Sequence, residues 1–152
     1  MWRIRPDDLT GDAIRALVIE HLTHMRSLSP AESVHALDVA AMREPGVTMF
    51  TAWNDRTLGG MAALKRLDAH RGELKSMRTT DAARGRGVGR ALLRHVVDIA
   101  RAEGLASLSL ETGSEDEFAA ARALYASEGF IECGPFADYV DDPLSVFMTR
   151  SL

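Results

Sequence analysis

The stretch MRTTDAARGRGVGRALL, Met77–Leu93, decides the fold. Glycine occupies every second position across Gly85–Gly89, and an arginine stands beside each of these glycines. Without side chains in the way, consecutive backbone N–H groups can converge on an anion at the positive end of the helix that follows. The neighbouring arginines, Arg84, Arg86 and Arg90, add charge-assisted hydrogen bonds. The stretch therefore predicts a loop that holds a phosphate, and it suits a diphosphate better than a single carboxylate.

Glycines at such spacing also occur in different kinds of loop. A flexible basic turn would need no ligand. A P-loop is excluded, because it requires Lys and then Ser or Thr after its last glycine, whereas Arg90 and Ala91 stand there. In a dinucleotide-binding fold Arg90 would occupy the place of the third glycine, and that fold begins with this unit instead of reaching it late. Glu111 nevertheless stands near the position of a ribose-binding acid, so the spacing alone leaves this alternative open.

Regular elements surround the loop on both sides. The apolar spacing predicts a strand, two helices joined by a bend at Pro30, and three strands before the loop. After it come a helix that ends at Gly104, a strand, a helix closed by Gly129 and two final strands. The predicted segments, apart from the helix that follows the loop, are 1–6, 9–28, 31–42, 47–53, 58–67, 73–79, 105–111, 117–128, 130–134 and 145–152. The order β-αα-βββ-α-β-α-ββ predicts a mixed sheet with helices on its faces.

Length and composition narrow the class of protein. The chain has 152 residues without a repeat or linker, so we expect a single domain over 1–152. The net charge of -4 argues against binding to nucleic acid or an anionic membrane, although all but two of the 18 basic residues are arginine. Cys133 is the only cysteine, which excludes an intrachain disulfide. No leader and no run of 18 apolar residues is present, so we expect a soluble cytoplasmic protein.

Two motifs together resemble a known family. The segment Arg84–Gly89 is similar to the R/Q-x-x-G-x-G/A segment of the GNAT superfamily of N-acetyltransferases. The predicted element order is that of the family, and Ala121–Phe130 resembles its second signature, A-x-x-LY-x-x-x-GF. The resemblance covers nearly the whole chain. The segments ELKSMRT, LSLETGS and PFADYVDDPLSVFM further resemble a bacterial branch of small GNATs, some of which carry a label linking them to indole-acetate metabolism.

The resemblance implies a fold and a cosubstrate. It implies a mixed α/β fold in which a mostly antiparallel sheet of six to seven strands is flanked by about four helices. It implies acetyl-coenzyme A as cosubstrate, with the pyrophosphate held by the loop, here Arg84, Gly85, Arg86, Gly87, Val88, Gly89 and Arg90. The end of the preceding strand, Met77, Arg78 and Thr79, would pair through its backbone with the pantetheine arm where two strands splay apart. One N–H group of that strand would polarise the thioester carbonyl.

The implied chemistry needs an acid and a base, because the acceptor amine must lose a proton and coenzyme A leaves as a thiolate. Tyr125 matches the family tyrosine whose hydroxyl points at the sulfur, and its alternative role is that of a core aromatic residue. Glu73 and Glu111 occupy positions that face the acceptor site in some members. Either can instead be a solvated carboxylate, with a chain of water molecules as the route for the proton. Cys133 has no basic neighbour to activate it, so we expect direct attack by the amine.

The acceptor is less well defined. In the family its site is walled by the bend between the first two helices and by the loop before the last strand, here 24–35 and 135–143. Phe136 and Tyr139 would contact an apolar or aromatic group and Arg26 a carboxylate, which suits an amino acid or a related small amine. Three acids in the same loop would instead attract a cationic amine, a polyamine or a lysine side chain: Asp138, Asp141 and Asp142.

One position departs from the family pattern. Many members carry an asparagine seven residues before the tyrosine, where it bonds the cofactor, and here that residue is Phe118. The contact must be lost or supplied by a neighbour such as Ser114. Three histidines fall where the acceptor site is walled, His21, His24 and His35, but no third partner gives them the context of a metal site, and we predict no metal.

The functional hypothesis is therefore an N-acetyltransferase that acts on the primary amine of a small molecule. A sensor that binds acetyl-coenzyme A without turnover and an enzyme that acetylates a protein or peptide amine stay open. An RNA or DNA binder using ARGRGVGR is disfavoured by the net charge and by the absence of interleaved aromatic residues. A homodimer is common in the family and is left open for this chain.

Overall fold

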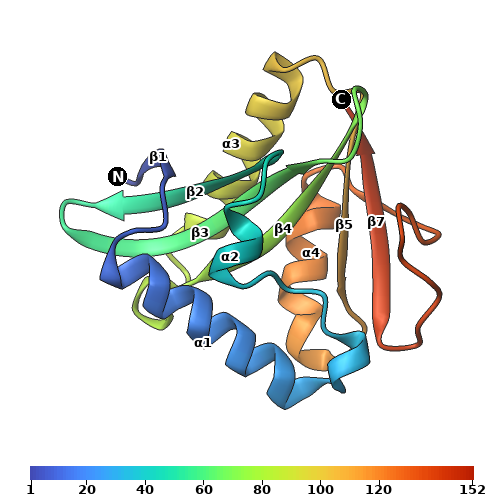
Figure 1. Ribbon diagram of the computed structural model, residues 1–152, viewed down its shortest axis with the longest axis horizontal. Helices are drawn as coiled ribbons and strands as arrows, with labels where there is room; N and C mark the ends of the chain where they lie inside the picture. Colours follow the sequence, from blue (N-terminus) through green and yellow to red (C-terminus); the bar gives the residue numbers. More distant parts are fainter.

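The computed structural model describes residues 1–152 and has a seven-stranded sheet at its centre (Figure 1). The strands are β1 (Arg3–Asp7), β2 (Val47–Asn54), β3 (Thr57–Arg66), β4 (Arg71–Thr79), β5 (Ser107–Gly113), β6 (Ile131–Cys133) and β7 (Ser145–Ser151). Their order across the sheet is β1-β2-β3-β4-β5-β7-β6, and only β4 and β5 are parallel neighbours. The predicted mixed, mostly antiparallel sheet is confirmed.

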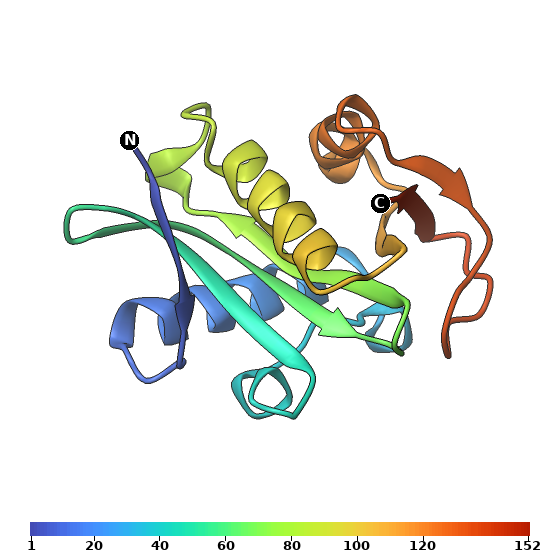
Figure 2. The same cartoon turned by 90° about the horizontal axis from the view of Figure 1, so that it is seen from above.

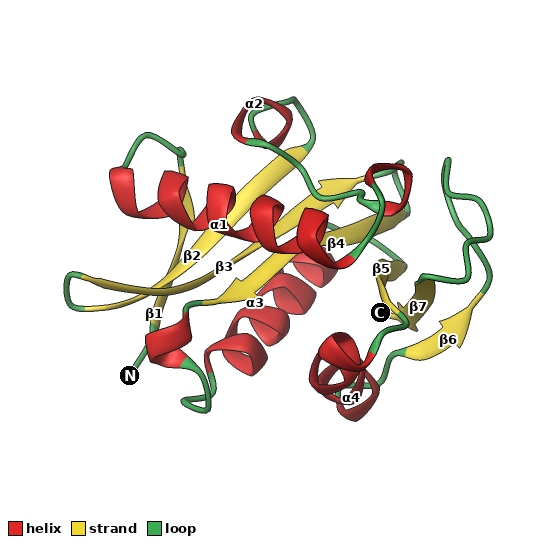
Figure 3. Ribbon diagram, turned by 90° about the horizontal axis from the view of Figure 1, so that it is seen from below, coloured by secondary structure: helices red, strands yellow, loops and turns green.

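Helices cover both faces of the sheet (Figure 2). Helices α1 (Asp12–Leu28) and α2 (Val39–Met42) lie on one face, and α3 (Val88–Ala102) and α4 (Ala119–Ser127) on the other. Figure 3 shows α1 crossing the face formed by the central strands. Short 3-10 turns at Ala31–Ser33, Asp81–Ala83 and Asp116–Phe118 complete the connections. The predicted order of elements is confirmed, and no helix combines the length and the apolar character needed to cross a lipid bilayer.

The central strands are apolar because both of their faces are buried. Along β3 the side chains alternate: Ala62 and Leu64 pack toward α3, whereas Met61 and Ala63 pack toward α1. Each face therefore has its own core, and strands buried on both sides read as continuous apolar runs in the sequence.

The second helix is shorter than the sequence predicts. We expected a helix from about Ala31 to Met42, but only Val39–Met42 is α-helical, and Val34 leaves the 3-10 turn in an extended conformation. The Asp38 side chain accepts a hydrogen bond from the Ala41 N–H and so starts a new helix. Tertiary contacts hold the intervening residues, because Ser33 bonds Asp142 and the His35 ring packs against Tyr139.

The glycine pair in β3, Gly59 and Gly60, forms a β-bulge and allows other segments to approach closely. Ala52 pairs with Gly60 while the next residue, Trp53, pairs with Leu58, so Gly59 is the extra residue. A Cβ atom on Gly59 would lie 2.3 Å from the Trp2 ring, and one on Gly60 would lie 2.8 Å from the Arg78 carbonyl oxygen and from Val88. Gly60 thus lets the end of β4 and the start of α3 both lie close against β3.

Candidate active site

The site begins where two parallel strands separate. β4 and β5 pair only from Arg71 and Ser107 as far as Leu74 and Leu110. Beyond these residues the two strands diverge, as Figure 1 shows, and the end of β4 has no partner on that edge. Ser76 lies at the divergence with a φ of +54°, a backbone conformation that is rare for a residue with a side chain. The separation places backbone groups and side chains of both strands around one cavity.

The glycine loop presents unpaired backbone donors. Gly85 and Gly87 have φ values of +76° and +80°, which a glycine adopts without strain. The Arg86 N–H donates to the Ala83 carbonyl, but the N–H groups at 85, 87, 88, 89 and 90 have no backbone or side-chain partner. These donors surround the first turn of α3, so the loop has the form of an anion-binding nest.

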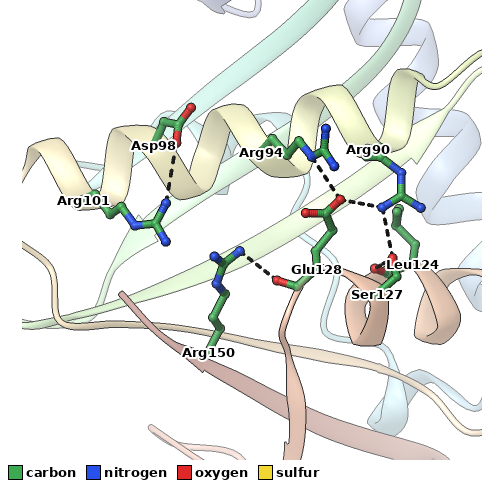
Figure 4. Close-up of polar contacts among 8 residues, drawn as sticks. All are labelled: Arg90, Arg94, Asp98, Arg101, Leu124, Ser127, Glu128 and Arg150. Carbon is green, nitrogen blue, oxygen red and sulfur yellow. Dashed lines mark hydrogen bonds and ion pairs between the residues drawn. The ribbon is translucent and has the colours of Figure 1, made fainter.

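The three arginines of the loop do not act alike. Arg84 is exposed, lines the cavity beside the loop and pairs with Asp81 at 2.8 Å. Arg86 contributes its carbonyl to the Trp2 indole N–H and does not line that cavity. The guanidinium of Arg90 reaches α4, where it bonds Ser127 and Glu128 (Figure 4). Of the predicted charges at the loop, therefore, only that of Arg84 faces the cavity.

Two adjoining cavities run along the separation. One, of about 610 Å³, is lined by the glycine loop, by Met77, Arg78 and Thr79, and by α4. The other, of about 210 Å³, lies between β4, β5 and the ends of α1 and α4. Six residues line both: His24, Met77, Arg78, Glu117, Ala121 and Tyr125. The two cavities therefore meet, with the loop at one end and the β4–β5 carboxylates at the other.

Tyr125 stands at this junction. Its side chain is 7% exposed and packs edge-to-face on Phe130, while its hydroxyl has no hydrogen-bond partner within the chain. Burial, and then the nearby Glu111 carboxylate, raise the pKa of Tyr125 to about 12. The hydroxyl consequently keeps its proton at neutral pH.

Glu73 is buried in a hydrogen-bonded cluster and is not a solvated strand-end residue. Its Oε2 atom accepts a 2.5 Å bond from the Tyr139 hydroxyl and lies 3.3 Å from the Lys75 ammonium. Lys75 also donates to the Tyr139 oxygen at 2.8 Å. The side chains of Glu73 and Lys75 are 3% and 8% exposed. Burial, and then Glu73, raise the pKa of Tyr139, so this phenol stays a donor.

Glu111 has a different environment, although it faces the same cavity. Only Ser145 donates a hydrogen bond to its side chain, at 2.9 Å. Burial raises the pKa of Glu111 to about 7, against the opposing effects of the Ser145 bond and of the nearby Lys75 charge. A carboxyl group with such a pKa exchanges a proton readily near neutrality. Glu111 does not line the cavity beside the glycine loop, which argues against the ribose-binding role.

The loops above the smaller cavity are tied together by side chains. Ser29 donates to Glu115 at 3.1 Å, and Ser33 donates to Asp142 at 2.5 Å. His35 packs edge-on against Tyr139, with ring centroids 5.0 Å apart. The bend after α1, one of the two segments predicted to wall the acceptor site, is thus joined to the other, the loop before β7, and also to the loop after β5.

Three residues predicted to contact the acceptor, Arg26, Phe136 and Asp138, lie outside the lining of the smaller cavity. Arg26 is exposed on the last turn of α1 and does not line the smaller cavity. Phe136 packs behind Tyr139 and against Phe147, also outside the lining. Asp138 is exposed as well.

The residue that replaces the family asparagine has a packing role. The Phe118 ring occupies the space above Gly113, where a Cβ atom would lie 2.1 Å from it, and it lines the smaller cavity. The neighbouring Ser114 hydroxyl donates to the Pro143 carbonyl, so its proton is already committed.

Sequence reasoning did not predict that the charged side chains of Lys75 and Arg78 are buried in the wall of the smaller cavity. Both are charged residues within a strand that is otherwise buried, and a buried charged side chain rarely occurs without a partner. The bulge at Ser76 hid their burial, because it breaks the alternation that tells which face a strand residue occupies.

The chain is similar to acetyltransferases in sequence. The model of the Acetyltransferase (GNAT) family matches residues 14–130. The chain is 49% identical over 149 residues to the uncharacterized N-acetyltransferase YsnE of Bacillus subtilis, covering 98% of this chain and 99% of that protein. It is 47% identical over 152 residues to the uncharacterized N-acetyltransferase YedL of Escherichia coli, covering 100% and 96%.

Solved structures share its fold. A putative acyl-CoA N-acyltransferase from Klebsiella pneumoniae superposes with a TM-score of 0.81 at 27% identity, covering 100% of this chain and 98% of that one. A GNAT family acetyltransferase from Elizabethkingia anophelis, solved with acetyl-CoA bound, superposes with a TM-score of 0.67 at 16% identity, covering 99% and 98%.

Proposed function

Since the chain belongs to the GNAT family of acetyltransferases, we propose that it transfers the acetyl group of acetyl-coenzyme A to the primary amine of a small molecule. The observation that carries this proposal is the meeting of two cavities at Tyr125, one lined by the glycine loop and the other by Glu111. The first suits a pyrophosphate and the second a small amine.

The residues at the loop fit the cosubstrate. Five unpaired N–H groups at the start of α3 match the oxygens of a pyrophosphate, and Arg84 adds a positive charge. The unpaired edge of β4, from Met77 to Thr79, leaves room for an extended arm with amide groups. Acetyl-coenzyme A bound there supplies an activated acetyl group, which the amine takes directly, and a thiolate leaving group.

We assign the role of base to Glu111. A base needs an accessible carboxylate with a pKa near the working pH, and Glu111 has both a place in the cavity lining and a pKa of about 7. Glu73 is the weaker candidate because Tyr139 and Lys75 already occupy its Oε2 atom. Its role is to hold Tyr139 in the cavity wall.

Tyr125 serves as the acid in this scheme. It holds its proton at neutral pH and lines both cavities, so its hydroxyl faces the point where the leaving thiolate and the amine would meet. A free hydroxyl is available to donate to the sulfur.

Direct attack is favoured over a route through an acylated cysteine. Cys133 lies on β6, outside the lining of both cavities. Burial also raises the pKa of the Cys133 thiol, which lowers its thiolate fraction.

A small acceptor is favoured by the small volume of the second cavity and by the contacts between the loops above it. Its volume is about 210 Å³, and the Ser29–Glu115, Ser33–Asp142 and His35–Tyr139 contacts join the loops above it. A protein amine would have to pass these contacts.

The test is acetyl-coenzyme A–dependent thiol release with a panel of amines, polyamines and lysine peptides. We expect turnover of at least one small amine, and a roughly hundredfold or larger fall for Tyr125→Phe with unchanged affinity for acetyl-coenzyme A. Binding of acetyl-coenzyme A without turnover of any acceptor would indicate a sensor. Turnover of peptides alone would replace the small molecule with a protein substrate.

A further inference from the structure

One wall of the smaller cavity carries polar atoms that nothing in the chain satisfies. They are His21 Nδ1 on α1 and Ser76 Oγ and Arg78 Nε on β4, all on residues that line this cavity. Buried polar atoms in folded proteins nearly always have a partner. Three of them on residues that line a single cavity leave this wall short of polar partners, which favours a polar ligand group beside it.

Arg78 is the charge at this wall. Its side chain is 10% exposed, and the guanidinium is held by Glu20 at 3.0 Å and by His24 Nδ1 at 3.0 Å. These contacts engage two of its five N–H groups, and Nε–H is among those left. Because Nε is sealed from solvent, the donors left for a carboxylate are the remaining N–H groups of Nη1 and Nη2, in a guanidinium whose orientation is fixed.

The bulge in β4 turns Arg78 toward the cavity. Leu74, before the bulge, and Met77, after it, both belong to the core on the α3 side. Ser76 breaks the alternation between them with its positive φ, so Arg78 faces α1 and the histidines. Strain of this kind persists where the surrounding structure requires it.

The two ends of the cavity have opposite character. At the β4–β5 end, the carboxylates of Glu73 and Glu111 stand against the single ammonium of Lys75. At the α1 end, Arg78 lies with His21 and His24, and the Glu20 carboxylate that pairs with Arg78 lies outside the cavity lining. An acceptor that carries a cation and an anion a few bonds apart matches both ends at once.

We propose that Arg78, with Ser76 and His21, forms a carboxylate subsite, and that the acceptor is an amino acid whose amine faces Glu111. This rests on the proposed acetyl transfer and names its substrate class. The Arg78 side chain would serve the acceptor, while its backbone remains available to the cosubstrate arm.

Paired acceptors test the proposal. The pairs are phenylalanine and 2-phenylethylamine, leucine and isopentylamine, and lysine and 1,5-diaminopentane, which differ only in the carboxylate. We expect the protein to prefer the amino acid of at least one pair by roughly tenfold to hundredfold in kcat/KM, the range for one charged hydrogen-bonded contact. Arg78→Gln should remove this preference by raising KM for the amino acid alone.

Three controls accompany the pairs. Arg56→Gln, in the exposed β2–β3 turn, makes the same chemical change away from both cavities and should keep the preference. Arg26→Gln tests the residue favoured by sequence, and loss of the preference there but not at Arg78 would overturn the proposal. So would a wild-type protein that treats both members of every pair alike, or an Arg78→Gln variant that loses affinity for acetyl-coenzyme A and turns over all acceptors equally slowly.

A measurement without turnover separates this inference from the proposed function. Calorimetric titration of the protein saturated with coenzyme A should detect binding of the preferred amino acid and of the matching acid without an amine, such as 3-phenylpropanoate. Both should weaken in Arg78→Gln. If these compounds bind through Arg78 but no acceptor is acetylated, the carboxylate subsite stands and the transferase function is rejected. If acceptors are acetylated but no Arg78-dependent binding is found, the transferase function stands and the carboxylate subsite is rejected.

Discussion

Glu73 and Glu111 face the same cavity, yet their neighbours give them different chemistry. Glu73 is bonded by a phenol and an ammonium, whereas Glu111 receives one hydroxyl bond in a buried setting. The sequence places both at strand ends but contains no signal that ranks them, because the ranking depends on Tyr139 and Ser145, which come from distant segments.

The pKa of Glu111 predicts the pH dependence of activity. A carboxylate base must be ionised, so kcat/KM should rise with pH through about 7 and then level off. At higher pH, loss of a proton from the acceptor's ammonium group should add a second rise. Glu111→Gln should lose the first of these rises and fall by roughly a hundredfold or more. The measurement is thiol release from about pH 5.5 to about pH 9. Glu73→Gln is the matched variant and should keep the rise of kcat/KM through about pH 7. If Glu73→Gln loses this rise and Glu111→Gln keeps it, Glu73 is the base.

The same residue predicts a change in stability. The pKa of Glu111 is higher in the folded state, about 7, than its ordinary value of 4.5, so the folded protein binds the extra proton and loses stability as pH rises through about 7. Glu111→Gln removes the buried charge and keeps an acceptor for Ser145. We expect the variant to be more stable by about 1–3 kcal/mol at about pH 8 and nearly unchanged at about pH 5. Urea unfolding at both pH values measures this, and an equal difference at the two would disprove burial of the charge as the cause.

The start of α3 is the element whose function could be read most directly from sequence. Its glycines at alternate positions predict N–H groups free to converge on an anion, and the structure leaves those at 85 and 87–90 unpaired, with Gly85 and Gly87 at positive φ. The directions of the arginine side chains were not predictable, since Arg90 turns to Glu128, the residue directly after α4. Likewise, the break in the predicted second helix arises from contacts of Ser33 and His35 with the loop before β7.

A pair of glycine variants tests the loop. Gly87 and Gly104 lie at the two ends of α3, both have a φ of +80°, and neither has an atom within 4 Å of an added Cβ. Ala at either position should destabilise the fold by a similar amount, about 1 kcal/mol. Only Gly87→Ala should weaken acetyl-coenzyme A binding, by roughly tenfold, because it disturbs the N–H groups around the first turn. Calorimetry on both variants decides this, and equal affinities would remove the loop from the cosubstrate site.

At the scale of the whole molecule, the sheet order brings the site together. β4 and β5 are adjacent and parallel, which requires the α3 crossover and puts the glycine loop at the end where the strands separate. The order of elements and the type of sheet could be predicted from apolar spacing. The smaller cavity could not, because its walls come from α1, β4, β5, α4 and two loops whose contacts depend on side chains far apart in sequence. The carboxylate subsite proposed at Arg78 was therefore not predictable from the sequence, which pointed to Arg26 instead.

The most direct test of the account follows the acetyl group itself. The protein is loaded with acetyl-coenzyme A labelled in the acetyl carbons, mixed with an acceptor that it turns over, and stopped within a single turnover. We expect the labelled acetyl group to be attached to the amine nitrogen of the acceptor, no label on the protein, and a rate that falls in Glu111→Gln and Tyr125→Phe. Label held on the protein, or label that stays with coenzyme A in the presence of every small amine, would contradict this expectation.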